Sequence, residues 1–298
     1  MRSPPPRIPP SLEAQNRRLG LLFVLPAVAL VFAVIIYPVF FNLYLSLWKP
    51  ALNPAKPDLF VGFGNYARLL ADPQFYRSLA LTAVYVALTV AGSTLLGGSA
   101  ALLMNRDFRG RKFARSALLL SYVMPVISSV FVWIYLFNPL YGMVDYALVD
   151  LLGLFEVAPQ WFDDPVLSLL LVCLFDIWRI FPFALIMILS SLQSIDGAVY
   201  EAALIDGARP FRIFRCITLP EILPVVASVV TLRSIWNFYK FEDVYLLTKQ
   251  VPILGVYLYR TAFTVNDLGL ASAISVVMFA LVMGIVFVAA ARRKGASS

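Results

Sequence analysis

The sequence predicts an all-α protein, an integral membrane bundle of six transmembrane helices, and two observations carry this prediction. Hydrophobic residues make up 61% of the 298 residues and charged residues only 14%, with a mean hydropathy of +0.83. A soluble domain of this length cannot hide so large an apolar fraction in its core. The apolar residues also form long runs, and a helix needs about 20 such residues to cross the hydrocarbon layer.

The apolar runs predict six spans and, with their flanks, the domain organisation. The spans are Leu21–Leu47, Leu79–Met104, Ser116–Phe137, Val166–Leu192, Ile222–Phe241 and Leu270–Ala291. The first run is too long for the apolar region of a cleavable signal peptide, so we expect it to stay in the protein. The Arg- and Pro-rich residues 1–18 predict a disordered cytoplasmic tail, residues 19–293 the transmembrane domain, and residues 294–298 a cytoplasmic C-terminal tail.

Basic residues predict the orientation of these spans. If both termini are cytoplasmic, the inner segments hold most of the 24 Lys and Arg residues, whereas the outer loop 138–164 carries acids and no base. The inner set is Arg2, Arg7, Arg17, Arg18, Arg106, Arg109, Arg111, Lys112, Arg115, Arg209, Arg212, Arg215, Arg292, Arg293 and Lys294. The positive-inside rule therefore places both termini and residues 200–220 in the cytoplasm. The net charge of +7 is a topology signal, and we expect no nucleic-acid partner.

Missing residues exclude several chemistries. The chain has no histidine, so it cannot build a catalytic triad with histidine, a His-based metal site or a histidine proton relay. Cys173 lies within a span and Cys216 in the cytoplasmic segment, so we expect neither a disulfide nor a paired-cysteine metal site. No phosphate-binding loop of the GxxxxGK[ST] kind occurs. We expect no catalytic residue, metal or bound cofactor, and energy must come from a partner or an ion gradient.

The polar segment Tyr200–Pro220 predicts a helical hairpin. Residues 200–205 are mostly good helix formers, and Asp206-Gly207 offers the left-handed stop that often ends a helix. Arg209-Pro210 can open a second helix, because proline is tolerated in a first turn. The paired alanines beside Glu201 permit close approach of another surface. From these features alone, docking to a partner and an amphipathic connector lying on lipid headgroups are both open interpretations.

The stretch "EAALIDGA", followed by "ITLP", resembles the EAA loop of permease subunits in binding-protein-dependent ABC importers. The stretches "YPVFFNLYLSLW", "FVGFGNYARLL", "WIYLFNPLYG", "DIWRIFPF", "SSLQSID" and "FEDVYLLT" resemble, in this order, the carbohydrate importers of the maltose and trehalose type. The resemblance runs from about Leu19 to Arg293. It departs from the family's glycine-glycine-proline pattern in "KQVPILGVYLYRTAF".

The resemblance implies a fold, partners and a location. The fold is the type I ABC importer permease (MetI-like) fold, in the bacterial cytoplasmic (inner) membrane. The partners are a second homologous permease, two copies of an ABC ATPase subunit that use ATP and Mg, an extracellular or periplasmic sugar-binding protein, and membrane lipid. The loop 194–220 would couple to the ATPase through Tyr200, Glu201, Ala202, Ala203, Asp206, Gly207, Ala208 and Pro210.

A second set of polar residues lies within the predicted spans, where charges are expensive and usually functional. Asp176 and Arg179 share one helix face, which Phe183 extends, and Arg233, Trp236, Asn237 and Lys240 form a stripe on the next span. These positions also resemble the sugar-contacting ones of the maltose-type permease, although most are charged here. Two interpretations stay open: ion pairs of Asp176 with Arg179 or Arg233 that only fix the helices, and a substrate pathway of aromatic and polar groups.

These observations predict a permease subunit that carries a di- or oligosaccharide such as trehalose or maltose and catalyses no reaction. An importer permease for glycerol phosphate or another anionic small solute is an alternative, because the polar set carries three bases against Asp176. An ion-driven secondary transporter is a further alternative, although no internal repeat is evident. A membrane enzyme would need a nucleophile or metal constellation, and the sequence offers none.

Overall fold

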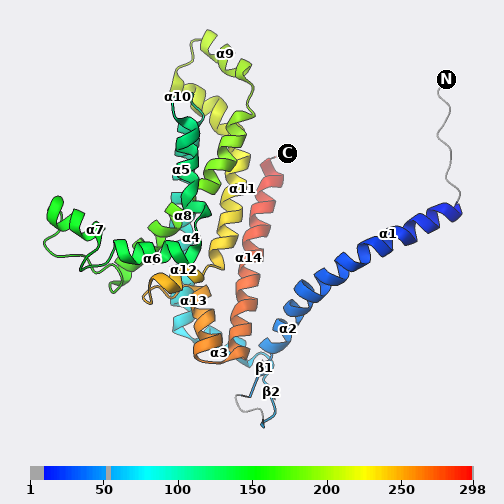
Figure 1. Cartoon of the computed structure of the whole chain (residues 1–298). Helices are drawn as coiled ribbons and strands as arrows, with labels where there is room; N and C mark the ends of the chain where they lie inside the picture. The colour runs from blue at the N-terminus through cyan, green and yellow to red at the C-terminus, as the bar shows by residue number, and fades with distance from the viewer. Residues whose placement is uncertain (1–9, 52–54, 297–298) are drawn as a thin grey trace. The chain divides into compact units, whose positions relative to one another are not determined.

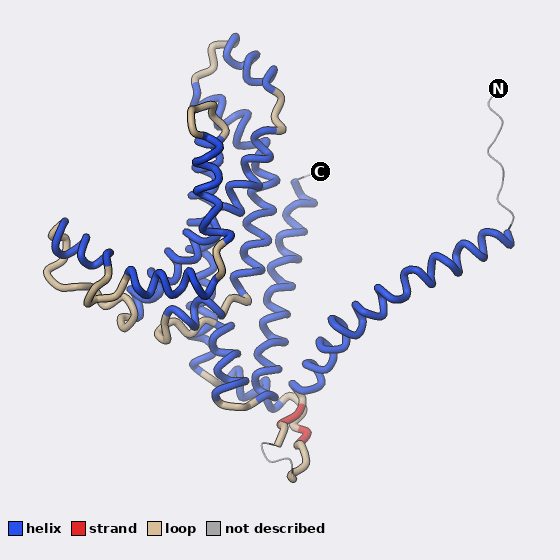
Figure 2. Tube along the Cα trace, viewed as in Figure 1, coloured by secondary structure: helices blue, strands red, loops and turns tan. Residues whose placement is uncertain are grey.

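The computed structural model describes residues 10–51 and 55–296, and these divide into two compact units. The first unit comprises the described residues up to Leu69 together with Asn266–Val276. The second comprises Leu70–Val265 and the described residues from Val277 onward. The described chain is helical apart from loops and two short strands, so the predicted all-α class is confirmed for this part of the chain (Figure 2).

The first unit contains a long apolar helix and a small sheet. The helix consists of α1 (Pro10–Val31), a π-helical turn (Phe32–Ile36) and α2 (Tyr37–Ser46), and its residues Leu19–Ser46 are long and apolar enough to span a membrane. Strands β1 (Trp48–Lys49) and β2 (Leu59–Phe60) pair antiparallel, and α3 (Gly64–Ala71) follows. Buried Asn65 donates to the carbonyl oxygens of Ser46 and Trp48, each at 2.9 Å. It thereby satisfies the Ser46 carbonyl at the end of α2, which lacks a partner within the helix, and joins α3 to the Trp48 carbonyl of β1.

The predicted disordered tail, residues 1–18, overlaps the first helix in the part that the structure describes. Helix α1 begins at Pro10 and continues through Arg18, because the stretch after Pro10 is rich in good helix formers such as Leu12, Glu13 and Ala14. Residues 1–9 lie outside the described chain. The last helix, α14 (Leu268–Ala296), likewise runs beyond Arg293 into the predicted C-terminal tail.

The second unit is built on three long helices that pack together (Figure 1). They are α4 (Pro73–Met104), α8 (Pro165–Gln193) and α11 (Leu219–Phe238), with α5 (Arg111–Val123) packed against α8. Two of these helices begin at an Asp-Pro pair. The Asp72 carboxylate accepts from Gln74 N, and that of Asp164 accepts from Val166 N and Leu167 N. These caps satisfy free amides at the helix starts. Proline is tolerated in the first turn, because the N–H that it lacks would have no partner within the helix.

Helices α4 and α8 approach closely because one face of α4 carries small residues. Ser78, Thr82, Thr89 and Ser93 are at most 1% exposed and follow helical spacing. Gly97 continues this face, and a Cβ built there would lie only 2.6 Å from the Ala184 Cβ and from the Phe181 carbonyl oxygen. Small residues allow such close backbone approach between helices in a membrane.

The third predicted span is wrong as a single helix. Helix α5 ends at Val123 and α6 (Val126–Leu136) begins after Pro125, with a bend of 97° between them. Proline disfavours helical backbone at the preceding residue, and Met124 is accordingly extended. The described chain therefore has five helices that meet the length and apolarity of a span, or six if the bent pair counts as one.

The remaining elements of the second unit are short. They are α7 (Met143–Asp145), α9 (Gly197–Ile205), α10 (Pro210–Ile213), α12 (Glu242–Leu247), α13 (Leu254–Tyr259) and π-helical turns at Tyr146–Leu151, Phe214–Thr218 and Arg260–Thr264. The fifth span ends at Phe238, three residues before the predicted Phe241. Buried residues of α12 and α13 join one hydrophobic cluster with Tyr85, Val130 and Phe175. Phe175 of this cluster directly precedes Asp176 in α8.

Candidate functional site

The segment between α8 and α11 folds as the predicted hairpin. Helix α9 begins after Asp196, whose carboxylate accepts from Ala198 N at 3.0 Å, and ends at Ile205. Gly207 has a φ of +71° and donates to the Leu204 carbonyl, while Ala208 donates to the Ala203 carbonyl, both at 3.0 Å. This pair of bonds is a Schellman motif, which needs a left-handed residue where glycine carries no steric cost. The predicted helix end at Asp206-Gly207 and the helix start at Pro210 are confirmed. The second helix is not a separate surface helix, because α10 continues through the π-helical turn Phe214–Thr218 into α11.

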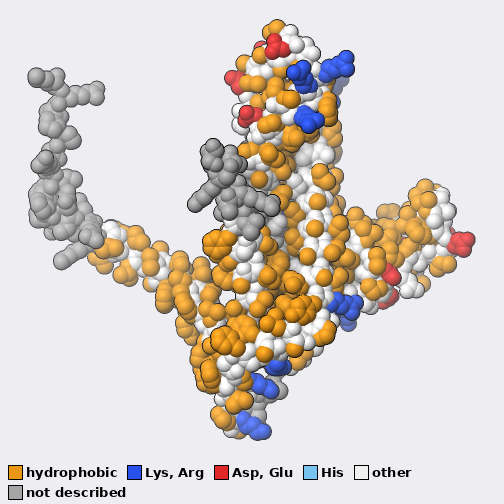
Figure 3. Space-filling view, turned by 180° about the vertical axis from the view of Figure 1, so that it is seen from behind, with side chains coloured by type: hydrophobic (Ala, Val, Ile, Leu, Met, Phe, Trp, Pro, Cys, Tyr) orange, Lys and Arg blue, Asp and Glu red, His pale blue; other side chains and the backbone are white. Residues whose placement is uncertain are grey.

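The hairpin turns most of its side chains to the surface. No residue of α9 is buried, and Ile205 and Phe211 are 87% and 73% exposed. Figure 3 shows charged side chains of both signs gathered around the hairpin among exposed hydrophobic ones. The Tyr200 hydroxyl points back and shares a 3.2 Å hydrogen bond with the Thr218 hydroxyl at the base of α11. The hairpin is thus tied to the helix that follows it while its outer face stays uncovered.

The predicted coupling residues divide accordingly. Glu201, Ala202, Asp206, Gly207 and Pro210 are exposed. Tyr200, Ala203 and Ala208 are partly buried. The hairpin therefore exposes the end of α9, the start of α10 and several apolar side chains. The contact of the predicted coupling residues with an ATPase stays a prediction.

A network of charged and polar side chains is buried where α4, α8 and α11 meet. Its centre is Asp176 of α8, which has no exposed surface. One of its oxygens, Oδ2, accepts from Arg233 Nη2 at 2.7 Å and from Asn237 Nδ2 at 3.0 Å. Asn237 also donates to the Thr89 hydroxyl of α4 at 2.6 Å. Four side chains therefore connect three helices in an environment that excludes water.

Lys240 and Asp243 extend this network beyond the end of α11. Lys240 Nζ lies 2.9 Å from Asp243 Oδ2 and 3.5 Å from Asp176 Oδ1. Asp243 is 1% exposed, and Arg233 is 3% exposed. Two carboxylates thus face two cations, which compensates the cost of removing each charge from water.

The other predicted pathway residues are less buried. Trp236 is 48% exposed, and its ring lies 5.3 Å from that of Phe183. Arg179 is partly buried and, within the described chain, makes no hydrogen bond or ion pair. Arg179, Phe183, Trp236 and the partly exposed Lys240 therefore differ from Asp176, Arg233 and Asn237, which the protein covers.

The structure decides between the two ion pairs that the sequence left open, and it adds Asp243 and Thr89 to the network. Asp176 pairs with Arg233 and not with Arg179. The predicted stripe on α11 splits, because Arg233 and Asn237 face the network while Trp236 is half exposed. Sequence reasoning missed Asp243 and Thr89. Two signals in the sequence could have identified them: the i,i+3 spacing of Asp243 from Lys240, and the run of small polar residues at helical spacing that includes Thr89.

The fold and these sites define a helical membrane protein with an exposed hairpin and a buried network in which two carboxylates face two cations. Residues 93–294 match the family described as "Binding-protein-dependent transport system inner membrane component". The chain belongs to this family and is an ABC transporter permease. The predicted recognition, the permease fold and the location in an inner membrane are confirmed at this level.

Relatives and solved structures agree with this assignment. The chain is 54% identical over 267 residues to the inner membrane ABC transporter permease protein YcjO of Escherichia coli, covering 90% of this chain and 91% of that protein. It is 33% identical to the trehalose/maltose transport system permease protein MalF of Thermococcus litoralis, covering 93% and 94%. A chain of the crystal structure of a bacterial alginate ABC transporter with a pentasaccharide-bound periplasmic protein has a TM-score of 0.76 at 20% identity, covering 93% and 94%. That likeness shows the shared fold.

Proposed function

We propose that the chain forms, together with a second homologous permease, the pathway by which an ABC importer carries a di- or oligosaccharide across the cytoplasmic membrane. Two ATPase subunits would bind the two permeases and hydrolyse ATP with Mg, and a sugar-binding protein would deliver the substrate. Both termini and the hairpin would face the cytoplasm, as the basic residues predict. The carbohydrate class is supported by the trehalose/maltose permease among the relatives.

The observation that carries the coupling role is the exposed hairpin. Ile205 and Phe211 leave apolar surface uncovered, which suits burial against another protein. The Schellman bonds fix the corner of the hairpin at Gly207, and the Tyr200–Thr218 hydrogen bond ties α9 to the start of α11. Movement of a docked ATPase would therefore be transmitted to the helix that carries Arg233 and Asn237.

We assign substrate contact to the less buried members of the polar set. A sugar needs aromatic surface for its C–H faces and polar groups for its hydroxyls. Phe183 and Trp236 offer the first, and Arg179 and Lys240 offer the second. Asp176, Arg233 and Asn237 hold the helices around them. An anionic solute such as a glycerol phosphate is the second candidate, because the Arg179 guanidinium has no ion pair in the described chain.

Reconstitution of the complete transporter tests this function. The permeases, ATPase and binding protein are placed in proteoliposomes, and uptake of radiolabelled trehalose, maltose and glycerol phosphate is measured with and without internal ATP. We expect disaccharide uptake that requires ATP and the binding protein. Uptake that persists without ATP and follows an imposed proton gradient would support an ion-driven transporter instead. Uptake of glycerol phosphate alone, lost in Arg179→Gln, would support the anionic candidate.

A further inference from the structure

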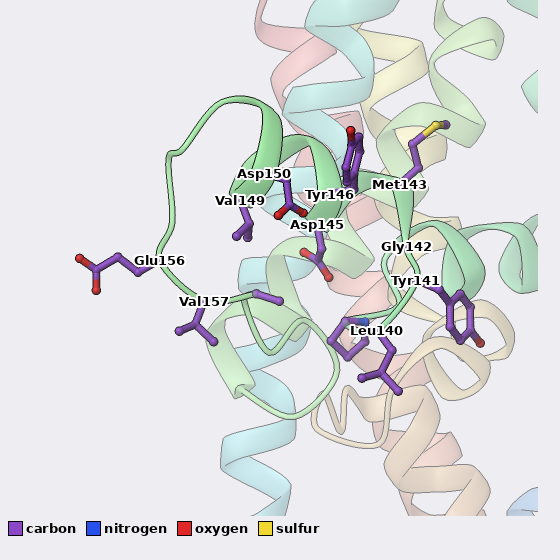
Figure 4. A pocket seen from close by; sticks show the side chains of 12 residues that line it. Leu140, Tyr141, Gly142, Met143, Asp145, Tyr146, Val149, Asp150, Glu156 and Val157 are labelled. Carbon is purple, nitrogen blue, oxygen red and sulfur yellow. The ribbon is translucent and has the colours of Figure 1, made fainter.

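A cavity of about 520 Å³ lies in the connection between α6 and α8. Its lining comes from three parts of this connection: residues 139–143 after α6, α7 with the π-helical turn after it, and residues 156–158. Figure 4 shows Asp145 and Asp150 near one another within this ring of side chains, with Glu156 at its edge. The volume falls within the range of about 300–1,000 Å³ that is usual for pockets that bind organic groups.

The cavity is acidic and contains an anchored carboxylate. Asp145, Asp150 and Glu156 line it, and residues 138–164 contain no Lys or Arg. Asp145 is 4% exposed, and its Oδ1 accepts from the Trp161 indole N–H at 2.7 Å. Its other oxygen, Oδ2, has no hydrogen-bond partner among the described residues. A buried carboxylate oxygen without a protein donor is costly, so a donor group that enters the cavity would stabilise this oxygen.

The surroundings of Asp145 favour an organic cation over a metal ion. Within the described chain no three acidic or cysteine side chains are grouped closely enough to hold a metal. The rim is instead apolar, because Leu140, Tyr141 and Val157 are 89%, 61% and 78% exposed. Lys and Arg side chains combine a cationic head with an apolar stem, and such a rim can pack against that stem.

We propose that this cavity receives a Lys or Arg side chain from the surface of the substrate-binding protein when that protein docks on the transporter. This inference rests on the proposed function, which places residues 138–164 on the outer side of the membrane. The cationic head would pair with Asp145 Oδ2 and Asp150, and the apolar rim would cover its stem. Charge complementarity of this kind sets the orientation of a partner and speeds its encounter.

Neutral variants of the cavity test the proposal in the complete transporter. Asp145→Asn keeps an oxygen for the Trp161 N–H, and Asp150→Asn changes an exposed side chain. Asp163→Asn is the matched control, because Asp163 is an exposed acid of the same connection that does not line the cavity. Affinity of the sugar-loaded binding protein is measured by surface plasmon resonance on transporter in nanodiscs, with co-purification of all subunits as the check of assembly.

We expect Kd to rise about tenfold or more in Asp145→Asn, less in Asp150→Asn, and not in Asp163→Asn. The Lys and Arg residues of the binding protein are also replaced by Met, one at a time. One of these replacements should raise the Kd on the wild-type transporter but cause no further rise on the Asp145→Asn transporter. Unchanged Kd in both cavity variants, or equal weakening in Asp163→Asn, would overturn the proposal. The difference in Kd between wild type and Asp145→Asn should also persist in nanodiscs that lack lipids with amine headgroups. If it vanishes there, a lipid headgroup is the occupant and the proposal is overturned. ATP-driven uptake by the wild type tests the proposed function separately.

Discussion

Asp176→Asn should destabilise the protein strongly, because it removes a charge and leaves the shape of the side chain. In the wild type, Asp176 and Asp243 balance Arg233 and Lys240. After the change Lys240 keeps Asp243, whereas Arg233, which is 3% exposed, loses its counter-charge. Breaking a buried ion pair on one side costs about 3–5 kcal/mol. At about 2 °C per kcal/mol for a chain of this size, the thermal midpoint should fall by roughly 6–10 °C.

The assay is thermal unfolding of the assembled transporter in nanodiscs, followed by the loss of soluble complex on heating. Asp107→Asn is the matched control. Asp107 forms an ion pair of similar length, 2.8 Å to Arg111, but its side chain is 99% exposed, so we expect no measurable shift. A midpoint of Asp176→Asn within about 2 °C of the wild type would refute the conclusion that the network holds these helices together.

Asp176→Leu combined with Arg233→Met separates the two roles of the network. Removing both charges leaves Lys240 and Asp243 as a neutral pair at 2.9 Å, so most of the lost stability should return. Since Asp176 and Arg233 are covered by the protein, we expect the double variant to keep uptake with an unchanged dependence on substrate concentration. A stable, assembled double variant that no longer transports would place Asp176 and Arg233 in the substrate route.

Three further changes test the helix contact, the hairpin and the pathway. Gly97→Ala should cost about 1–3 kcal/mol in thermal unfolding, because its Cβ meets the Ala184 Cβ at 2.6 Å, whereas Gly98→Ala, whose nearest contact is 3.5 Å away, should be neutral. Gly207→Pro cannot adopt the φ of +71° or donate to Leu204, so ATP hydrolysis should persist while uptake is lost; Gly207→Asn, which tolerates this φ, should transport. Trp236→Ala should lower uptake while the subunits still co-purify, and an assembly defect instead would assign Trp236 to the subunit contacts.

Helix starts and ends that depend on a few adjacent residues could be predicted from the sequence. The stop at Asp206-Gly207 and the start at Arg209-Pro210 depend on local backbone preferences, and the structure has both. The apolar runs fixed the number of long helices to within one. Prolines inside the predicted spans indicated kinks, but they did not distinguish Pro125, where the helix breaks, from Pro26, Pro182 and Pro224, which stay inside their helices. Each proline costs a helix about 3 kcal/mol, and tertiary packing decides whether the helix continues.

Partners that lie far apart in the sequence could not be derived in the same way. Helical spacing placed Arg233 and Asn237 on one face of a span, but it does not give the rotation of that span against its neighbours. The bonds that define the network join Asp176 to Arg233 across 57 residues and Asn237 to Thr89 across 148. Only the packing of α4, α8 and α11 brings these side chains together.

The same pairing changes the argument about substrate charge. In the sequence, three bases opposed Asp176, and this excess supported an anionic solute. The structure adds Asp243 and uses Arg233 and Lys240 to balance the two carboxylates. Arg179 is then the one cation of this set without an ion pair in the described chain. Because a single guanidinium can donate to sugar hydroxyls as well as to a phosphate, the charge excess no longer favours an anionic solute over a neutral sugar.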